Sequence, residues 1–194
     1  MIKIKSAREI ALMRDAGKVA ASALQELERA IQPGVTTAEL DKLAGKLIRR
    51  AGGEPAFLGY QGFPASICTS INSEVVHGIP GLRRLKEGDI ISIDIGVSLK
   101  GYYSDTAVTF GVGKISSLAR RLIDVTRQSL EEGILAMRSG GHLSDISHAV
   151  QKYVESSGFS VVYSYAGHGI GTRMHEDPQV PNFGPAGHGP KLQP

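Results

Sequence analysis

Apolar residues recur at helical spacing in two stretches near the start of the chain. The first stretch follows an S-x-x-E capping box at Ser6 and Glu9, and the second follows a similar box at Thr36 and Glu39. Their apolar positions are Ile10, Met13, Ala20, Leu24, Leu27 and Ile31 in the first stretch, and Leu40, Leu43, Leu47 and Ile48 in the second. This spacing predicts two amphipathic helices, each ending at a glycine-containing stop.

The period of the pattern changes from about 3.6 to 2 in the middle of the chain. A β-rich segment covers residues 66–77, and every second residue of 91–95 is isoleucine. Another β-rich run ends at Phe110. We therefore predict an antiparallel hairpin whose turn is formed by Leu99 and Lys100.

This turn would place Asp94 directly opposite Asp105. Two carboxylates so placed repel each other by about 4 kcal/mol at roughly 4 Å and an effective dielectric of about 20. Either one acid keeps its proton or a divalent cation lies between them, because hard cations take oxygen ligands. The alternative is a turn that is one residue longer, in which case the two acids are unrelated.

The second half of the chain repeats the helical plan of the first. Ser117 is placed to cap a long helix that reaches Met137, and a shorter helix follows and stops at Gly158. A shift of 106 positions aligns Gly34 with Gly140, Leu40 with Ile146, Ile48 with Val154, Gly52 with Gly158 and Phe57 with Tyr163. We expect one domain of two α+β halves, 1–110 and 111–194, related by a pseudo-twofold axis.

The hairpin has no counterpart in the second half. The same shift moves Asp94 and Asp105 to positions 200 and 211, past the last residue. We therefore expect the second half to lack its final strands. A sheet edge left open in this way would lower stability or promote association.

Composition narrows the class of protein. Of the 194 residues, 41% are hydrophobic and 21% are charged, which excludes a disordered chain. The net charge of +3 comes without a run of Lys and Arg, so we expect no specific nucleic-acid binding. The single cysteine, Cys68, excludes an internal disulfide, and no apolar stretch has the length of a signal peptide or a membrane span. These features favour a cytoplasmic protein with no membrane partner.

Three histidines are candidates for chemistry. His77 is expected at the end of a strand formed by residues 75–76, His168 lies between glycines after an apolar run, and His175 precedes two acids. Any one of them is as consistent with a structural role. Together, two hairpin carboxylates and a histidine nitrogen form a ligand set suited to Mn, Fe, Co or Zn. The remaining histidines, for which a structural role is expected, are His142, His148 and His188.

Other conspicuous residues are ambiguous. Tyr60, Phe63 and Cys68 either line an apolar pocket or belong to the core. Cys68 is not expected to be a nucleophile, because nothing near it in the sequence lowers the pKa of its thiol. The GHGIG segment is not a dinucleotide loop, because its spacing is wrong and residues 174–178 do not open a helix.

Five motifs, taken in order, resemble one family. They are HGIP at His77, DIGV at Asp94, SDTAVTF at Asp105, GHGIG at His168 and MHEDPQVPNFG at His175. Their residues and spacing are similar to those of the bacterial-type (type I) methionine aminopeptidases, and the similarity covers almost the whole chain. The resemblance implies the pita-bread (creatinase/aminopeptidase) fold, two pseudo-symmetric halves with helices packed on a curved antiparallel sheet.

The resemblance also implies a role for each candidate residue. Asp94 would bind the first of two divalent ions, Asp105 would bridge both, and His168 would bind the second, the ions being Co, Mn, Fe or Zn. His77 and His175 resemble the family's substrate-contacting histidines, His175 supporting the oxyanion and His77 assisting the leaving nitrogen. The positions that match the family's methionine side-chain pocket are Tyr60, Phe63, Cys68 and Met174.

The reaction implied by this resemblance is the hydrolytic removal of N-terminal methionine by a metal-activated water. The expected partners are methionine peptides and nascent chains; a ribosome contact stays open, and the full-length protein is expected to be a monomer. The family has two further glutamate ligands beyond residue 194, so this chain is expected to bind metal incompletely and to be poorly active. The alternatives are an aminopeptidase P or prolidase, and a non-catalytic peptide- or ribosome-binding protein on the same fold.

Overall fold

Both predicted N-terminal helices are present and begin at the predicted capping boxes. In the computed structural model, which describes residues 2–193, the helices are α1, Ala7–Ala30, and α2, Thr37–Arg50. The backbone N–H of Ser6 donates to Glu9 Oε2 at 2.8 Å, and the N–H of Thr36 donates to Glu39 Oε2 at 2.7 Å. These bonds, with their reciprocal partners, satisfy groups that a helix start leaves unpaired.

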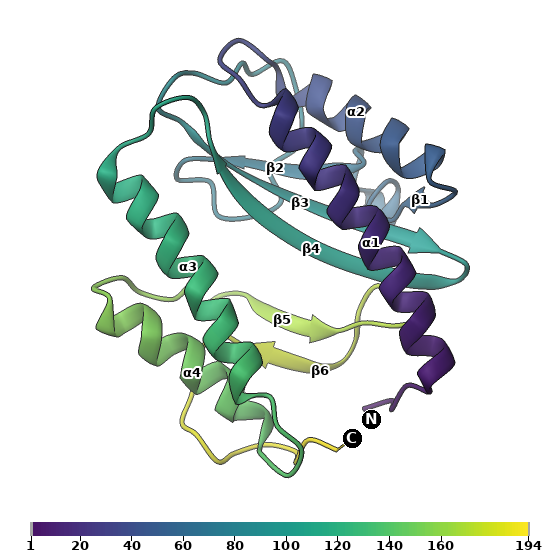
Figure 1. Cartoon of the computed structure of the whole chain (residues 1–194), viewed down its shortest axis with the longest axis vertical. Helices are drawn as coiled ribbons and strands as arrows, with labels where there is room; N and C mark the ends of the chain where they lie inside the picture. The colour runs from purple at the N-terminus through teal and green to yellow at the C-terminus, as the bar shows by residue number, and fades with distance from the viewer. Residues whose placement is uncertain (1, 194) are drawn as a thin grey trace. The chain divides into compact units, whose positions relative to one another are not determined.

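These helices cover a four-stranded antiparallel sheet (Figure 1). The strands are β1, Glu54–Pro55; β2, Ile67–Ile71; β3, Ile90–Leu99; and β4, Tyr102–Gly111, with a short 3₁₀ turn, η1, at Tyr60–Gly62. β1 and β2 both pair with one edge of β3, and β4 pairs with the other edge. The predicted β-rich segment 66–77 is therefore a strand only as far as Ile71.

The alternating pattern of β3 separates a core face from a polar face. Ile91, Ile93 and Ile95 are fully buried, in one cluster with residues of α1 and α2. Because successive strand residues point to opposite faces, Asp94 and Gly96 lie on the other side of the sheet. The helical residues of the core cluster include Ala20, Leu24, Leu27, Leu40, Ala44 and Ile48. The helices thus pack on one face of the sheet, and Asp94 and Gly96 lie on the face that α1 and α2 do not cover.

The remaining elements form a second compact unit. They are α3, Ser117–Ala136; α4, Leu143–Ser156; β5, Ala166–Gly169; and β6, Glu176–Pro181. The helices α3 and α4 pack on each other, and β5 pairs antiparallel with β6. The segment Ile170–His175 between these strands belongs to the first unit, with residues 3–116. Ser117 is the first residue of α3 rather than its cap, and α3 ends just before Met137.

The 106-residue shift holds for the helices and fails for the strands. It moves the bounds of α2 onto those of α4, and it moves the end of α1 onto the end of α3. It moves β2 to residues 173–177, whereas β5 has already ended at Gly169 and β6 begins only at Glu176. The shift therefore relates the helices of the two halves and not their strands. The pseudo-twofold axis stays a prediction.

The end of the described chain is held by α4 rather than by a sheet. After β6, residues 182–193 contain no helix or strand, apart from an isolated bridge between Lys191 and His142. Within residues 2–193, no helix combines the length and the apolar character that a membrane crossing requires.

Candidate functional site

Asp94 and Asp105 lie on the same face of the β3–β4 hairpin. Its turn consists of Lys100 and Gly101, which have φ values of 52° and 80°, as a two-residue type I′ turn requires. The predicted turn and register are therefore wrong, and Asp105 pairs with Gly96 instead of Asp94. Because the error is two residues and the period of a strand is also two, both acids stay on one face as diagonal neighbours.

The two carboxyl groups interact strongly. Burial raises the pKa of Asp94 from 3.8 to about 8, together with the negative charge of Asp105 and a hydrogen bond between the two groups. A proton or a cation is therefore needed to hold the pair at neutral pH. Carboxylate oxygens are the ligands that divalent cations prefer, so the pair fits a divalent metal ion.

Cys68 lies beside this pair on the neighbouring strand. It faces Asp94 across the β2–β3 ladder and is buried. Burial raises the pKa of its thiol to about 12, with smaller contributions from the charges of Asp94 and Asp105. The thiol therefore stays protonated at neutral pH, which confirms that Cys68 is unsuited to act as a nucleophile.

Gly96 makes room for an apolar wall next to Asp105. A Cβ atom added at Gly96 would come within 2.5 Å of Phe57 Cε1 and 3.1 Å of Met174 Cε. The ring of Phe63 meets that of Phe57 edge to face, with centroids 6.5 Å apart. Sequence reasoning missed Phe57 as a site residue, because a single aromatic residue in a loop carries no periodic signal. Its contact with Gly96, 39 positions away, identifies it.

Tyr60 and His175 form a pair within the first unit. The Tyr60 hydroxyl lies 2.8 Å from His175 Nδ1, and the two rings are nearly parallel, at 18°, with centroids 5.5 Å apart. The residue before His175, Met174, is buried. The structure thus brings together two residues that are 115 positions apart in the sequence.

His77 lies in an exposed loop and not at a strand end. β2 ends at Ile71, and the predicted strand residues Val75 and Val76 are 55% and 40% exposed, so that prediction is wrong. His77 has a positive φ of 58°, and the next residue, Gly78, packs so closely on Thr69 that no side chain would fit there. Glycine at 78 allows this loop to approach β2.

His168 lies in β5 of the second unit. Its Nδ1 is 2.9 Å from the carbonyl oxygen of Gly169, and a β-bulge separates these two residues. Since a carbonyl can only accept, Nδ1 carries the proton, and Nε2 is the unprotonated nitrogen of the neutral ring. This tautomer is the one that a histidine ligand requires when its other nitrogen donates to a carbonyl.

Over residues 2–193 the structure holds no cluster of three or more His, Cys, Asp or Glu side chains that could hold a metal ion. The ligand role of His168 stays a prediction. The structural role expected for the other histidines also stays a prediction, and their contacts are as follows. The N–H of His142 donates to Asp145 Oδ2 at the start of α4, His148 Nδ1 lies 3.2 Å from Gly184 O, and the N–H of His188 donates to Ser144 Oγ.

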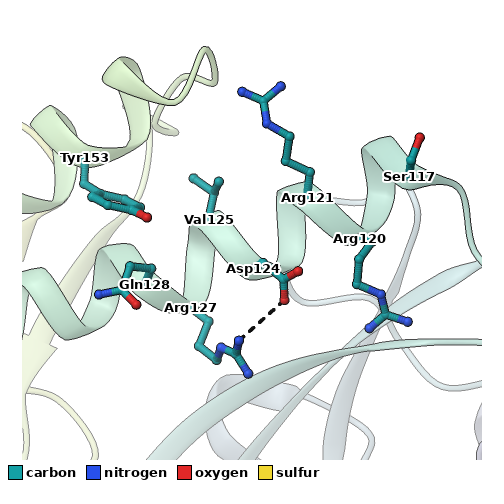
Figure 2. A pocket seen from close by; sticks show the side chains of 8 residues that line it. All are labelled: Ser117, Arg120, Arg121, Asp124, Val125, Arg127, Gln128 and Tyr153. Atoms are coloured by element: carbon teal, nitrogen blue, oxygen red, sulfur yellow. Dashed lines mark ion pairs between the residues drawn. The ribbon is translucent and has the colours of Figure 1, made fainter.

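A hollow of about 550 Å³ on α3 and α4 contains none of the predicted site residues (Figure 2). Three arginines line it, but they do not converge: Arg120 and Arg121 point away from each other, and Arg127 pairs with Asp124 at 3.5 Å. Arg121 also lies over the Phe159 ring and donates to the carbonyl of Ser157. This hollow is therefore not a competing site.

Comparison with known proteins gives a consistent result. Residues 11–194 match metallopeptidase family M24. The chain is 52% identical over 194 residues to methionine aminopeptidase 1 of Bacillus subtilis, covering all of this chain and 78% of that protein. It is 56% identical over 193 residues to methionine aminopeptidase of Clostridium acetobutylicum, covering 99% of this chain and 77% of that protein.

Solved structures agree at two levels. The crystal structure of methionine aminopeptidase from Rickettsia prowazekii has a TM-score of 0.98 and 44% identity, and the match covers all of this chain and 78% of that chain. Prolidase from Pyrococcus furiosus has a TM-score of 0.80 but only 20% identity, covering 93% of this chain and 52% of that chain. The second similarity shows the fold alone.

Proposed function

The chain belongs to metallopeptidase family M24, and from this membership we propose that it hydrolyses the first peptide bond of proteins and peptides that begin with methionine. Its relatives with this activity in their names are 52% and 56% identical over nearly the whole chain. The observation that carries the proposal is the Asp94–Asp105 pair on the free face of the sheet, beside an apolar wall.

The Asp94–Asp105 pair is the proposed centre of the metal site. Family membership implies a divalent metal, and the raised pKa of Asp94 indicates that the pair requires positive charge. We propose two ions, from Co, Mn, Fe and Zn, held by the pair and by His168 Nε2. When bound, such ions lower the pKa of a water molecule to near neutrality and polarise the scissile carbonyl.

The apolar wall is the proposed pocket for the methionine side chain. Phe57, Phe63 and Met174 provide aromatic and thioether surface, and such surface suits an unbranched thioether. The protonated thiol of Cys68 adds no charge. A charged side chain would lose its hydration here without gaining a partner, so the wall selects methionine over charged residues.

Two histidines are proposed to act on the peptide bond. His175 would donate a hydrogen bond to the oxygen that becomes negative in the transition state. His77 would assist the leaving nitrogen. Its loop, with Gly78 packed on Thr69 of β2, holds an exposed imidazole beside that strand.

Other parts of the prediction remain to be tested. Binding of nascent chains at the ribosome, the monomeric state and weak metal binding by these 194 residues stay predictions. Metal titration checks the last of these, and two tightly bound ions per chain would contradict it. The prolidase and aminopeptidase P alternative is disfavoured, because similarity to those structures is limited to the fold.

The direct test is methionine release from a Met-Ala-Ser peptide in the presence of Mn or Co. The B. subtilis relative serves as positive control and the Asp105→Ala variant as negative control. Release by this chain that the substitution abolishes supports the proposal. Metal binding and peptide binding without release would favour the non-catalytic alternative.

A further inference from the structure

Tyr60 is held in a fixed position by its own loop. The N–H of Tyr60 donates to Phe57 O at 3.0 Å, and the N–H of Phe63 donates back to Tyr60 O at 2.9 Å. Gly59 has a φ of 81°, a conformation that glycine adopts without strain. These short-range bonds fix the backbone from which the Tyr60 side chain extends.

His175 is held from the other side. Met174 is 2% exposed, and its Cε lies 3.1 Å from the position of a Cβ on Gly96 in β3. The N–H of Tyr103 donates to Gly171 O at 2.9 Å, which attaches the same segment to β4. The His175 backbone is therefore fixed relative to the sheet that carries the two acids.

The contact between these residues constrains where the imidazole proton lies. Tyr60 Oη and His175 Nδ1 are 2.8 Å apart. A phenol hydroxyl is a good donor, and an unprotonated ring nitrogen is a good acceptor. If the hydroxyl donates to Nδ1, the proton of neutral His175 must lie on Nε2.

We propose that Tyr60 is a positioning residue that holds His175 in the tautomer with the proton on Nε2. This inference rests on the proposed function, in which His175 donates a hydrogen bond to the developing oxyanion. Only the Nε2–H tautomer presents a donor on the side of the ring that faces away from Tyr60. The contact of Tyr60 Oη with His175 Nδ1 and the nearly parallel rings orient the imidazole plane.

The Tyr60→Phe variant tests this role, because it keeps the ring contact and removes only the hydroxyl. The matched control is Tyr102→Phe, which removes a hydroxyl that donates to Glu9 Oε1 at 3.2 Å, in the contact between α1 and β4. The readout is the pair of ring ¹⁵N shifts of His175 in the histidine-labelled 194-residue chain, above the pH at which histidine is charged. The His175→Gln variant assigns these signals.

We expect a protonated Nε2 and an unprotonated Nδ1 in the unmodified chain and in Tyr102→Phe. In Tyr60→Phe both shifts move toward the average of the two tautomers. A proton on Nδ1 in the unmodified chain, or unchanged shifts in Tyr60→Phe, overturns the inference.

Kinetics with a methionine peptide separate positioning from packing. Tyr60→Phe lowers kcat by roughly tenfold and leaves KM within about twofold, since the hydrogen bond it weakens forms in the transition state. If the ¹⁵N shifts of the His175 ring change in Tyr60→Phe while kcat stays the same, the catalytic role of the tautomer is overturned. If the unmodified chain shows the expected shifts but releases no methionine, the tautomer assignment is supported and the proposed function fails.

Discussion

Two helical pairs with matching bounds have different surroundings in this molecule. In the first unit, α1 and α2 pack on a four-stranded sheet, and Leu24 is 5% exposed. In the second unit, the counterpart of Leu24 at the 106-residue shift is Leu130, and it is 60% exposed. Amphipathic spacing alone therefore does not bury a helix face, because burial requires another element that packs on that face.

The proposed site residues, like the buried hydrophobic residues, are unevenly distributed between the two units. Of the proposed site residues, the first unit contains both acids, the apolar wall and the Tyr60–His175 pair, and the second unit contains His168. The first unit has a sheet face that α1 and α2 do not cover, and this face carries Asp94 and Asp105. Four pairs of substitutions test this difference between the units. Each pair has one residue in the first unit and one in the second.

The largest effect is expected at Asp105. We expect Asp105→Asn to lower metal-dependent methionine release by at least about a hundredfold, because a neutral amide cannot replace a carboxylate at a divalent ion. The matched variant in the second unit is Asp124→Asn, whose carboxylate pairs with Arg127 on the exposed side of α3. It should retain activity within about twofold in the same peptide assay. Equal losses would contradict the assignment of the chemistry to the first unit.

The next effect concerns the two leucines. Leu24→Ala should lower the free energy of unfolding by about 3 kcal/mol, since it removes buried methyl groups and leaves a cavity. Leu130→Ala should change it by less than about 0.5 kcal/mol, because the side chain is already exposed. Urea denaturation of both variants measures this difference. Similar values would show that α3 is covered in solution.

The pH dependence of stability should have opposite signs in the two units. The pKa of Asp94 is raised to about 8, so the metal-free folded chain binds more protons than the unfolded one between about pH 4 and 8. Its contribution to stability is therefore lost as pH rises, by at most about 1.4 kcal/mol per pH unit. Asp94→Asn should remove this slope in urea denaturation with a chelator present.

Asp145 provides the opposite case. The N–H of His142 and then the N–H of Gly187 donate to its carboxylate and lower its pKa. The Asp145 carboxylate therefore stabilises the folded chain at neutral pH, and this stabilisation is lost as the pH falls through the lowered pKa. Asp145→Asn should therefore destabilise the chain at pH 7 and have less effect in acid. If Asp145→Asn lowered the free energy of unfolding more at acidic pH than at pH 7, the predicted pH dependence would be contradicted.

The smallest effect is expected at the caps of α2 and α4. Thr36→Ala should lower the free energy of unfolding by about 1 kcal/mol, because Thr36 Oγ1 accepts from the Glu39 N–H at 3.2 Å. The counterpart at the same shift, His142, pairs with Asp145 through its backbone N–H, which alanine retains. His142→Ala should therefore lower stability less than Thr36→Ala does, as measured by thermal unfolding. The reverse order would show that the His142 side chain contributes to its cap.

Local signals predicted the helices well and the strands poorly. The capping boxes at Ser6 and Thr36 and the stop of α2 at Gly52 are confirmed, because helical hydrogen bonds join residues three or four positions apart. The first helix ends at Ala30, before the predicted stop at Gly34. The expected strand at Val75 and Val76 is wrong. Two β-branched residues satisfy strand propensity, but a strand also needs a partner edge, and β2 ends earlier.

The site was predicted by residue type more than by geometry. The motifs identified Asp94, Asp105 and the histidines, and the Asp94–Asp105 pair does lie together. Their register was wrong, because the left-handed conformation of Gly101 moves the turn by one position and the pairing by two. The pairing of Tyr60 with His175 was not predicted, since nothing local links positions 115 residues apart.

The sequence by itself determined the helices, the capping boxes of α1 and α2 and the presence of a hairpin that carries the two acids, because each depends on residues close together in the chain. Tertiary structure alone decided the register of β3 on β4, the contact of Phe57 with Gly96 and the pairing of Tyr60 with His175. Tertiary structure also determined that Leu24 is buried and that Leu130 is exposed. The physical reason is that burial and side-chain pairing depend on which distant segments meet, and a hydrophobic pattern does not specify the partner.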